Sequence, residues 1–388
     1  MTHMTSKRGV ISALVCLALL TIAFSGCISD VANSVAGIGE RPWESAESQK
    51  SGYGTKSTPH GEPSVDESDV DYTFRGANYL PPFAAKKTIT ITNGFGSARD
   101  CALASNNCEI HIQTWNESGY KFVATLEAGG FTPYEAESNL EKIQVKNTDS
   151  LSDGVLSIGI EAEYGGSSQL IGLGYYESVN VEAYVPSWAS YELYAGASGG
   201  DVSIEGISGT RLSVETSGGD VSVRDVVGSR LSIETSGGDV LVKNSASQQI
   251  RFKTSGGDIT MDGLECEDAS IQTSGGDISG EIIADRLDME TSGGGIEVKI
   301  GSVEYGSYDV STSGGDVSIY VKNGEKYGYD VRAKSSSGQI TIRLSDSENL
   351  GDYEDEDEAH YRTQDYESKD VQVKMNIKTS GGDIFVSD

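Results

Sequence analysis

One five-residue motif, Thr-Ser-Gly-Gly-Asp, returns through the second half of the chain as far as its last residues. The first glycines of the copies are Gly199, Gly218, Gly237, Gly256, Gly275, Gly293, Gly314 and Gly381, with a degraded copy at Gly338. The early copies are about 19 residues apart. A period in that range is typical of stacked units that are too small to fold alone. The motif therefore predicts the architecture and says little about a ligand.

Each unit contains two short runs in which apolar and polar residues alternate. In the unit that begins at Asp201, these runs are 202–205 and 211–216. Strict alternation predicts strands with one aliphatic face inside and one polar face in water. Ordering costs about 1–2 kcal/mol per residue, whereas about six buried aliphatic side chains return about 1.5–3 kcal/mol each, so one unit alone does not fold. We therefore predict an all-β protein, a parallel β-solenoid of about nine rungs over 191–388, with two or three sheets per turn left open.

The motif itself predicts three columns of side chains at the solenoid corners. The threonines are in phase with the inward aliphatic residues and should form a hydroxyl ladder, and the glycine pair is expected to supply positive φ. The aspartates follow as a column that includes Asp201, Asp220, Asp239, Asp258 and Asp277. Carboxylates at strand spacing repel one another, so something must offset their charge. We favour capping of corner N–H groups by each carboxylate over the alternative, calcium bound along the column.

Before the repeats, the chain begins with features of export. Residues 1–27 combine Lys7 and Arg8, an apolar run and the ending Ser25-Gly26-Cys27, which resembles a lipoprotein signal with Cys27 as the lipid-bearing residue. Residues 28–78 are rich in Ser, Gly, Glu and Asp and are predicted to be a disordered tether. We expect an exported protein, held at the cell membrane or cell surface through its lipid anchor.

Residues 79–190 read as a non-repetitive β region that caps the first rung. The Asn93-Gly94 turn, the strand 110–115, the stretch 179–186 and the serial Ser-Gly-Gly-Asp units together resemble the putative-adhesin β-strand-repeat family. That resemblance covers about residues 80–388 and implies a protein of the cell envelope without known catalytic residues. The segment 95–108 departs from the family pattern and reads as an inserted loop.

The inserted loop holds Cys101 and Cys108. In an exported protein, this spacing predicts a local disulfide, the alternative being two free thiols. A metal site is not expected, since only His111 lies near them in sequence and a tetrahedral site needs four ligands.

A second insertion interrupts the last repeats at 345–370. It contains five consecutive acidic residues, 354–358, and is predicted to be a solvated loop, with ligand or cation recognition as the alternative.

The charge balance limits the possible partners. The chain has 29 basic and 59 acidic residues and a formal net charge of −30, which excludes nucleic acid as a partner. The four histidines lie in four unrelated segments and form no acid/base set, so we expect no enzyme and no cofactor. The leading interpretation is an adhesin or envelope protein that binds a surface glycan or protein of unknown identity. The alternative is a stress or signalling component that binds another membrane protein, and a polysaccharide-active enzyme is less favoured.

Overall fold

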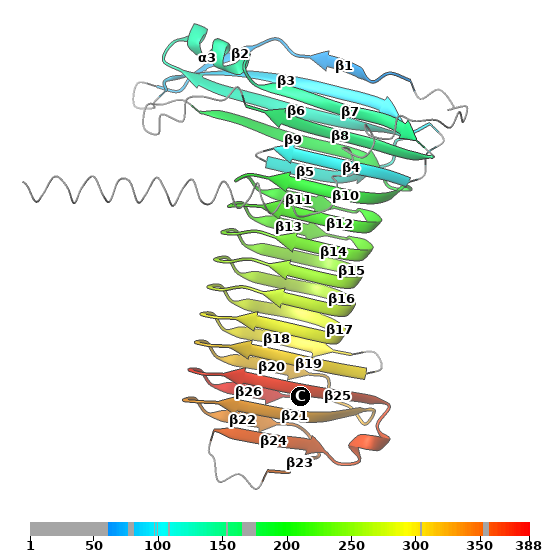
Figure 1. Cartoon of the computed structure of the whole chain (residues 1–388), viewed down its shortest axis with the longest axis vertical. Coiled ribbons are helices and arrows are strands. Elements are labelled where there is room, and N and C mark those ends of the chain that lie inside the picture. The colour runs from blue at the N-terminus through cyan, green and yellow to red at the C-terminus, as the bar shows by residue number, and fades with distance from the viewer. Residues whose placement is uncertain are drawn as a thin grey trace, which may run out of the picture. The chain divides into compact units, whose positions relative to one another are not determined.

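The computed structural model confirms the all-β prediction (Figure 1). It describes residues 61–76, 81–96, 98, 100–107, 109–152, 154–164, 176–302, 305–351 and 357–388. Within these residues there are 26 strands, the α-helix α3 (Pro133–Leu140) and a short 3-10 helix, η1 (Tyr366–Ser368). All of them belong to one compact unit, Thr55–Asp388. The signal segment with Cys27 lies outside the described residues.

The repeats form two parallel ladders of strands, which we call ladder A and ladder B. Ladder A consists, in spatial order, of β9 (Glu177–Pro186), β5 (Glu109–Trp115), β11 (Val202–Glu205), β13 (Val221–Arg224), the first parts of β15 (Val240–Lys253), β16 (Ile259–Gln272) and β17 (Ile278–Thr291), then β18 (Ile296–Gly301), β20 (Val317–Val321), β26 (Ile384–Ser387) and β22 (Ile340–Arg343). Ladder B consists of β8 (Val155–Glu163), β4 (Asp100–Asn107), β10 (Ser190–Ala197), β12 (Ser208–Thr216), β14 (Val227–Glu234), the second parts of β15 to β17, then β19 (Tyr305–Thr312), β25 (Val371–Thr379) and β21 (Tyr327–Ser335). Each coil in the middle of the chain gives one strand, or one part of a long strand, to each ladder.

The core lies between the two ladders and follows the predicted alternation. Val221 lies opposite Val202 and Val240 in neighbouring coils, and all three side chains are at most 1% exposed. Ser222, on the same strand, faces outward and is half-buried. A parallel solenoid fits these registers, and its number of rungs stays a prediction.

The sheet as a whole is mixed, because antiparallel strands adjoin the parallel ladders. Antiparallel strands cover the first coil, because β6 (Gly119–Gly130) pairs with β9, β3 (Phe83–Gly94) pairs with β6, and β7 (Gln144–Ser152) pairs with β8. Such strands occupy the edges that a stack would otherwise expose.

Two predicted segment assignments at this end were wrong. The tether was expected to extend to residue 78, but β1 (Ser64–Glu67) and β2 (Asp71–Phe74) pair with β3. Both strands are exposed along their whole length, so backbone hydrogen bonds rather than burial hold them, and hydrophobicity gave no signal. The inserted loop 95–108 contains β4, which pairs in parallel with β8 and β10.

At the C-terminal end, the coils are not stacked in the order in which they occur in the chain. The coil formed by β25 and β26 lies between the coil of β19 and β20 and the coil of β21 and β22 (Figure 1). The predicted acidic loop 345–370 includes β23 (Ser347–Asn349) and β24 (Glu358–Thr363), and β24 pairs antiparallel with β21. The insertion is therefore partly a cap on the last coil of ladder B rather than a plain loop.

Candidate functional site

The corner threonines hold neighbouring coils together. Thr235 Oγ1 donates to the carbonyl oxygen of Gly219 in the preceding coil (3.2 Å) and accepts the N–H of Gly238 in its own corner (3.2 Å). The same pair of bonds recurs at Thr216, Thr254, Thr273, Thr291, Thr312 and Thr379, and at Ser335 in the degraded copy. These hydroxyls are buried. Each one thus satisfies two backbone groups that burial would otherwise leave unpaired.

The glycine pair has a different role from the one predicted. Among the described residues, no glycine of a Ser-Gly-Gly pair has a positive φ, whereas Gly206 and Gly263, at the turns between the ladders, do. The second glycine is needed for close stacking, because a Cβ on Gly257 would lie 2.0 Å from the carbonyl oxygen of Gly238. A Cβ on Gly256 would meet nothing nearer than 3.7 Å. The second glycine of the pair is therefore required sterically, whereas the first position has room for a side chain.

The aspartate column caps backbone N–H groups, as the favoured interpretation expected. Oδ1 of Asp201, Asp220, Asp239 and Asp258 accepts the N–H of the aspartate in the next coil at 2.8–2.9 Å, and Oδ1 of Asp277 accepts the N–H of Gly295 at 2.7 Å. Each bond joins a carboxylate to a fixed dipole, which offsets part of the repulsion along the column. No group of three or more His, Cys, Asp or Glu side chains suited to a metal ion occurs among the described residues. Calcium on the column stays an untested prediction.

The cysteines give no reactive site within the described part of the chain. Cys101 is 2% exposed on β4, and burial raises the pKa of its thiol. It has no disulfide partner among the described residues, but Cys108 lies outside them, so the predicted disulfide stays a prediction. Cys266 lies within β16, between the parts that join ladder A and ladder B, and burial raises the pKa of its thiol to about 12. Both thiols are protonated at neutral pH and are therefore weak nucleophiles.

The outer face of ladder A carries two grooves that meet. One, of about 710 Å³, extends from Glu182 on β9 to Thr260 on β16, beside the aspartate column. The other, of about 400 Å³, extends from Leu241 on β15 to Tyr320 on β20. Leu241 and Thr260 line both, so we treat them as one feature, the A-face groove.

The outer face of ladder B carries a groove of about 640 Å³ with balanced charge. Arg286 forms a two-point ion pair with Asp268, and Arg230 donates to Gln249 Oε1 at 2.9 and 3.2 Å. These guanidinium groups bind to side chains of the neighbouring coil. They strengthen the outer face of the ladder, and Asp268 neutralises Arg286, whereas Arg230 keeps its charge because its partner is a neutral amide.

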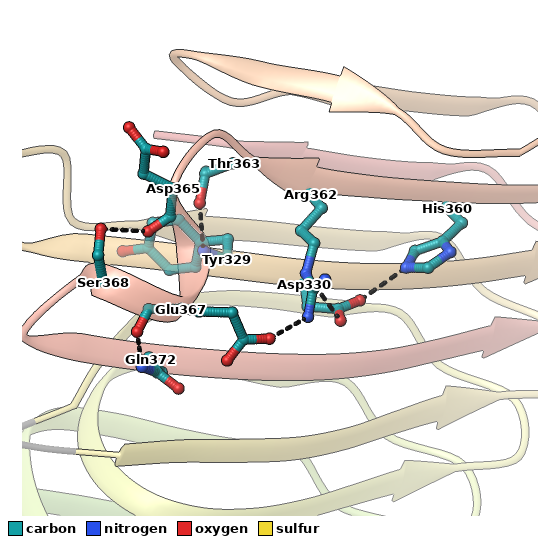
Figure 2. Close-up of polar contacts among 9 residues, drawn as sticks. All are labelled: Tyr329, Asp330, His360, Arg362, Thr363, Asp365, Glu367, Ser368 and Gln372. Carbon is teal, nitrogen blue, oxygen red and sulfur yellow. Dashed lines mark hydrogen bonds and ion pairs between the residues drawn. The ribbon is translucent and has the colours of Figure 1, made fainter.

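A polar cluster joins the insertion to the last coil (Figure 2). Asp330 on β21 lies 2.7 Å from His360 Nε2 and 3.5 Å from Arg362 Nε, both on β24. Arg362 also donates to Glu367 Oε1 at 2.9 Å and covers the ring of Tyr366 at 4.6 Å. The carboxylate and the imidazole are only 12% and 17% exposed.

The neighbours of this cluster have structural roles too. Thr363 Oγ1 accepts the N–H of Tyr329 at 2.9 Å (Figure 2). Burial, followed by the charge of Asp330, raises the pKa of Tyr366 to about 12, so its phenol stays neutral. The cluster resembles an acid/base pair in composition, but its groups are occupied in fastening β24 to β21.

Sequence comparison assigns the chain to a family. The model of the family described as Toastrack DUF4097 matches residues 100–387, which include both ladders. The chain belongs to the Toastrack DUF4097 family. The predicted resemblance to adhesin-type repeats is thereby confirmed, for a family whose function is unknown. No curated protein matches the chain.

Three solved structures with similarity to this Toastrack chain are bacterial proteins described as adhesins or cell adhesion proteins. A putative adhesin of Bacteroides fragilis is 12% identical over 78% of this chain and 97% of its own, with a TM-score of 0.36. A putative adhesin of Parabacteroides distasonis is 10% identical over 76% and 96%, with a TM-score of 0.37. A putative cell adhesion protein of Clostridium sporogenes is 10% identical over 78% and 99%, with a TM-score of 0.21. At these values, the family model rather than the structures carries the assignment.

The described residues of this Toastrack chain contain no helix that is long and apolar enough to span a membrane. The anchor residue predicted from the sequence, Cys27, lies outside them.

Sequence reasoning missed the helix α3, although Thr132-Pro133 signals a helix start: Thr132 Oγ1 accepts the N–H of Glu135 at 3.1 Å. It likewise missed the outward aromatic residues Tyr320 and Phe385, which the period-two pattern places on the outer face.

Proposed function

We propose that this protein is an adhesin-like protein of the cell surface, anchored by lipid on Cys27, whose repeats display a binding surface without catalysing a reaction. The observation that carries the proposal is the register of the two ladders. Each outward position of one coil lies beside the same position of the next, so the outer faces present ordered columns of side chains along the stack. Such a surface suits a large or repetitive ligand better than a small molecule.

The charge and the site chemistry support this proposal over an enzyme. The His360 cluster is occupied in structural contacts, and the described cysteines are buried or half-buried with raised pKa values. The net charge of −30 disfavours binding to anionic surfaces directly. The family assignment and the resemblance to adhesin repeats support a role in binding.

The anchor is tested by fractionating cells that produce either the full chain or its Cys27→Ser variant. We expect the full chain in the membrane fraction, labelled by a fatty-acid analogue, and the variant unlabelled and released. An unlabelled full chain would overturn the anchor. Adhesion is tested separately by comparing cells that display the protein with matched cells that lack it, in binding to host cells and to immobilised glycans. Equal binding by the two would overturn the adhesin role.

A further inference from the structure

Two aromatic side chains stand side by side on the outer face of ladder A, where the pattern of the repeat places polar residues. Tyr320 on β20 and Phe385 on β26 have ring centroids 6.0 Å apart and ring planes inclined at 59°. Their flanking residues Ile319 and Ile384 point into the core and are at most 1% exposed. The two rings are thus half-buried on the outside and contribute nothing to the interior. Exposed aromatic faces at such positions are a common feature of binding surfaces.

This aromatic pair adjoins one end of the A-face groove, where Phe385 lies beside Tyr320 and just beyond the groove lining. Tyr320 lines the groove, and the guanidinium of Arg343 lies 5.8 Å from the ring of Phe385. The groove crosses nine strands of ladder A, from β9 to β20, which at strand spacing is about 40 Å. A groove of that length accommodates several units of an extended polymer and is longer than a single small ligand needs.

The lining near the aromatic pair combines hydrogen-bond donors and acceptors. Lys243 and Lys299 supply donors, Glu281 and Glu297 supply acceptors, and Ser279 supplies a hydroxyl that does either. Few large apolar side chains accompany them, so the groove lacks the desolvated centre that a protein partner would need. Hydroxyl-rich sugars match such a surface, because each ring offers both donors and acceptors along its edge and an apolar C–H face that stacks on an aromatic ring.

We propose that the A-face groove binds an extended neutral polysaccharide, with sugar rings packed against Tyr320 and the neighbouring Phe385. This inference rests on the proposed adhesin-like function and names its ligand class and its site. Neutrality follows from charge, since the aspartate column borders the other end of the groove and repels an acidic glycan.

The test is native affinity electrophoresis of the detergent-solubilised full chain in gels that contain dextran, mannan, laminarin or hydroxyethylcellulose, with polygalacturonate as the acidic comparison. We expect at least one neutral polymer to retard the protein and polygalacturonate to have no effect. In the double variant Tyr320→Ala/Phe385→Ala, the apparent affinity for the polymer, obtained from the retardation, should fall at least tenfold. Tyr134→Ala is the control, because it removes a ring that is 79% exposed on α3.

A second variant guards against loss of folding. Ser279→Leu narrows the groove from β17 with a side chain that can neither stack on a sugar nor hydrogen-bond to it, and it should weaken retardation to a similar extent. Thermal unfolding reports whether each variant is folded. Retardation by polygalacturonate alone, retardation by none of the neutral polymers, or unchanged retardation of both folded groove variants would overturn the proposal. Displaying the double variant on cells separates the two hypotheses. Adhesion that persists in the double variant overturns only the polysaccharide site, whereas cells displaying the unaltered protein that do not adhere overturn the proposed function itself.

Discussion

The middle of the stack and its two ends are built by different rules. From β10 to β20, successive coils of the chain pair with one another in chain order, and one corner motif recurs. At each end, the coil next to the outermost comes from a distant segment: β4 with β5 at one end, β25 with β26 at the other. The middle therefore depends on local repetition and the ends on long-range pairing.

This difference has a physical purpose at the ends. A stack of parallel strands leaves an open edge that pairs readily with other chains. Antiparallel strands cover the edge at β9, and β24 covers β21. A coil inserted behind each outermost coil ties the ends to distant parts of the chain, so an end does not fray independently.

The largest effect is expected from removing residues 371–388. In a stack built in chain order this would remove only the outermost coil, but here it removes an internal one. The six buried side chains Val371, Val373, Met375, Ile377, Ile384 and Val386 together contribute on the order of 10 kcal/mol. Hydrogen exchange should show loss of protection from β19 through β24. Deleting residues 64–74, which are exposed, is the control and should leave both ladders protected, whereas protected β21 and β22 in the truncated chain would contradict the out-of-order arrangement.

The next effect concerns the corner glycines of the middle. Gly257→Ala should lower the free energy of unfolding by more than about 3 kcal/mol, because its Cβ collides with the backbone of the coil beside it. Gly256→Ala, one residue away, should cost less than about 1 kcal/mol. Guanidinium unfolding midpoints compare the two, and equal costs would show that close stacking does not require the second glycine.

A smaller and more local effect is expected at the C-terminal end. Asp330→Ala leaves His360 and Arg362 without their shared carboxylate and should cost about 2 kcal/mol. The faster hydrogen exchange should be confined to β24 and its surroundings. Asp288→Ala, an exposed carboxylate on β17, is the control. Faster exchange spread evenly over both ladders would mean that the cluster does not serve the end specifically.

The smallest effect is a pH dependence within the middle. Burial, then repulsion from Glu234, raises the pKa of Glu215 above its ordinary value of 4.5. Its protonated form favours the folded state, so this stabilisation is present below the ordinary pKa and is lost as the pH rises through the raised one. Glu215→Gln should therefore raise the melting temperature at pH 7 by less than about 3 °C and leave it unchanged at pH 3.5. The exposed Glu205→Gln is the control, and a variant that is stabilised equally at both pH values would rule out this linkage.

The repeat predicted what is local and missed what is long-range. The buried valines and isoleucines, the threonine hydroxyls and the aspartate caps all follow from the alternation and the motif. The order of the coils does not, because most corners offer the same threonine, glycine and carboxylate to their neighbours. The exceptions include Gly295 and Gln339 in place of the aspartate and Ser335 in place of the threonine. Thr379 bonds to Gly315 just as Thr312 bonds to Gly294, although the chain separations differ greatly. The corner contacts that most coils share therefore do not determine which coil lies next to which.

The candidate binding site shows the same limit. The outward position of Tyr320 is readable from the period-two pattern, as is that of Phe385. Their adjacency is not, because β26 lies beside β20 only through the out-of-order coil. In a stack built in chain order, β22 would lie beside β20, and Thr341 would be next to Tyr320 in place of Phe385. The sequence thus contains both rings of the proposed sugar platform without revealing that they meet.

The position of β25 and β26 in the stack also limits the order in which the coils can fold during synthesis. A chain that is synthesised from its N-terminus can add one coil after another through β20. Residues 327–363 cannot take their places until residues 371–387 have been made, because β21 and β22 pair with β25 and β26. For that interval, the unpaired edges of β19 and β20, with the end of the apolar core between them, stay open to water and to other nascent chains. Export machinery that holds the chain unfolded until its last strands arrive would shorten this exposure, and slow delivery of the final segment would lengthen it.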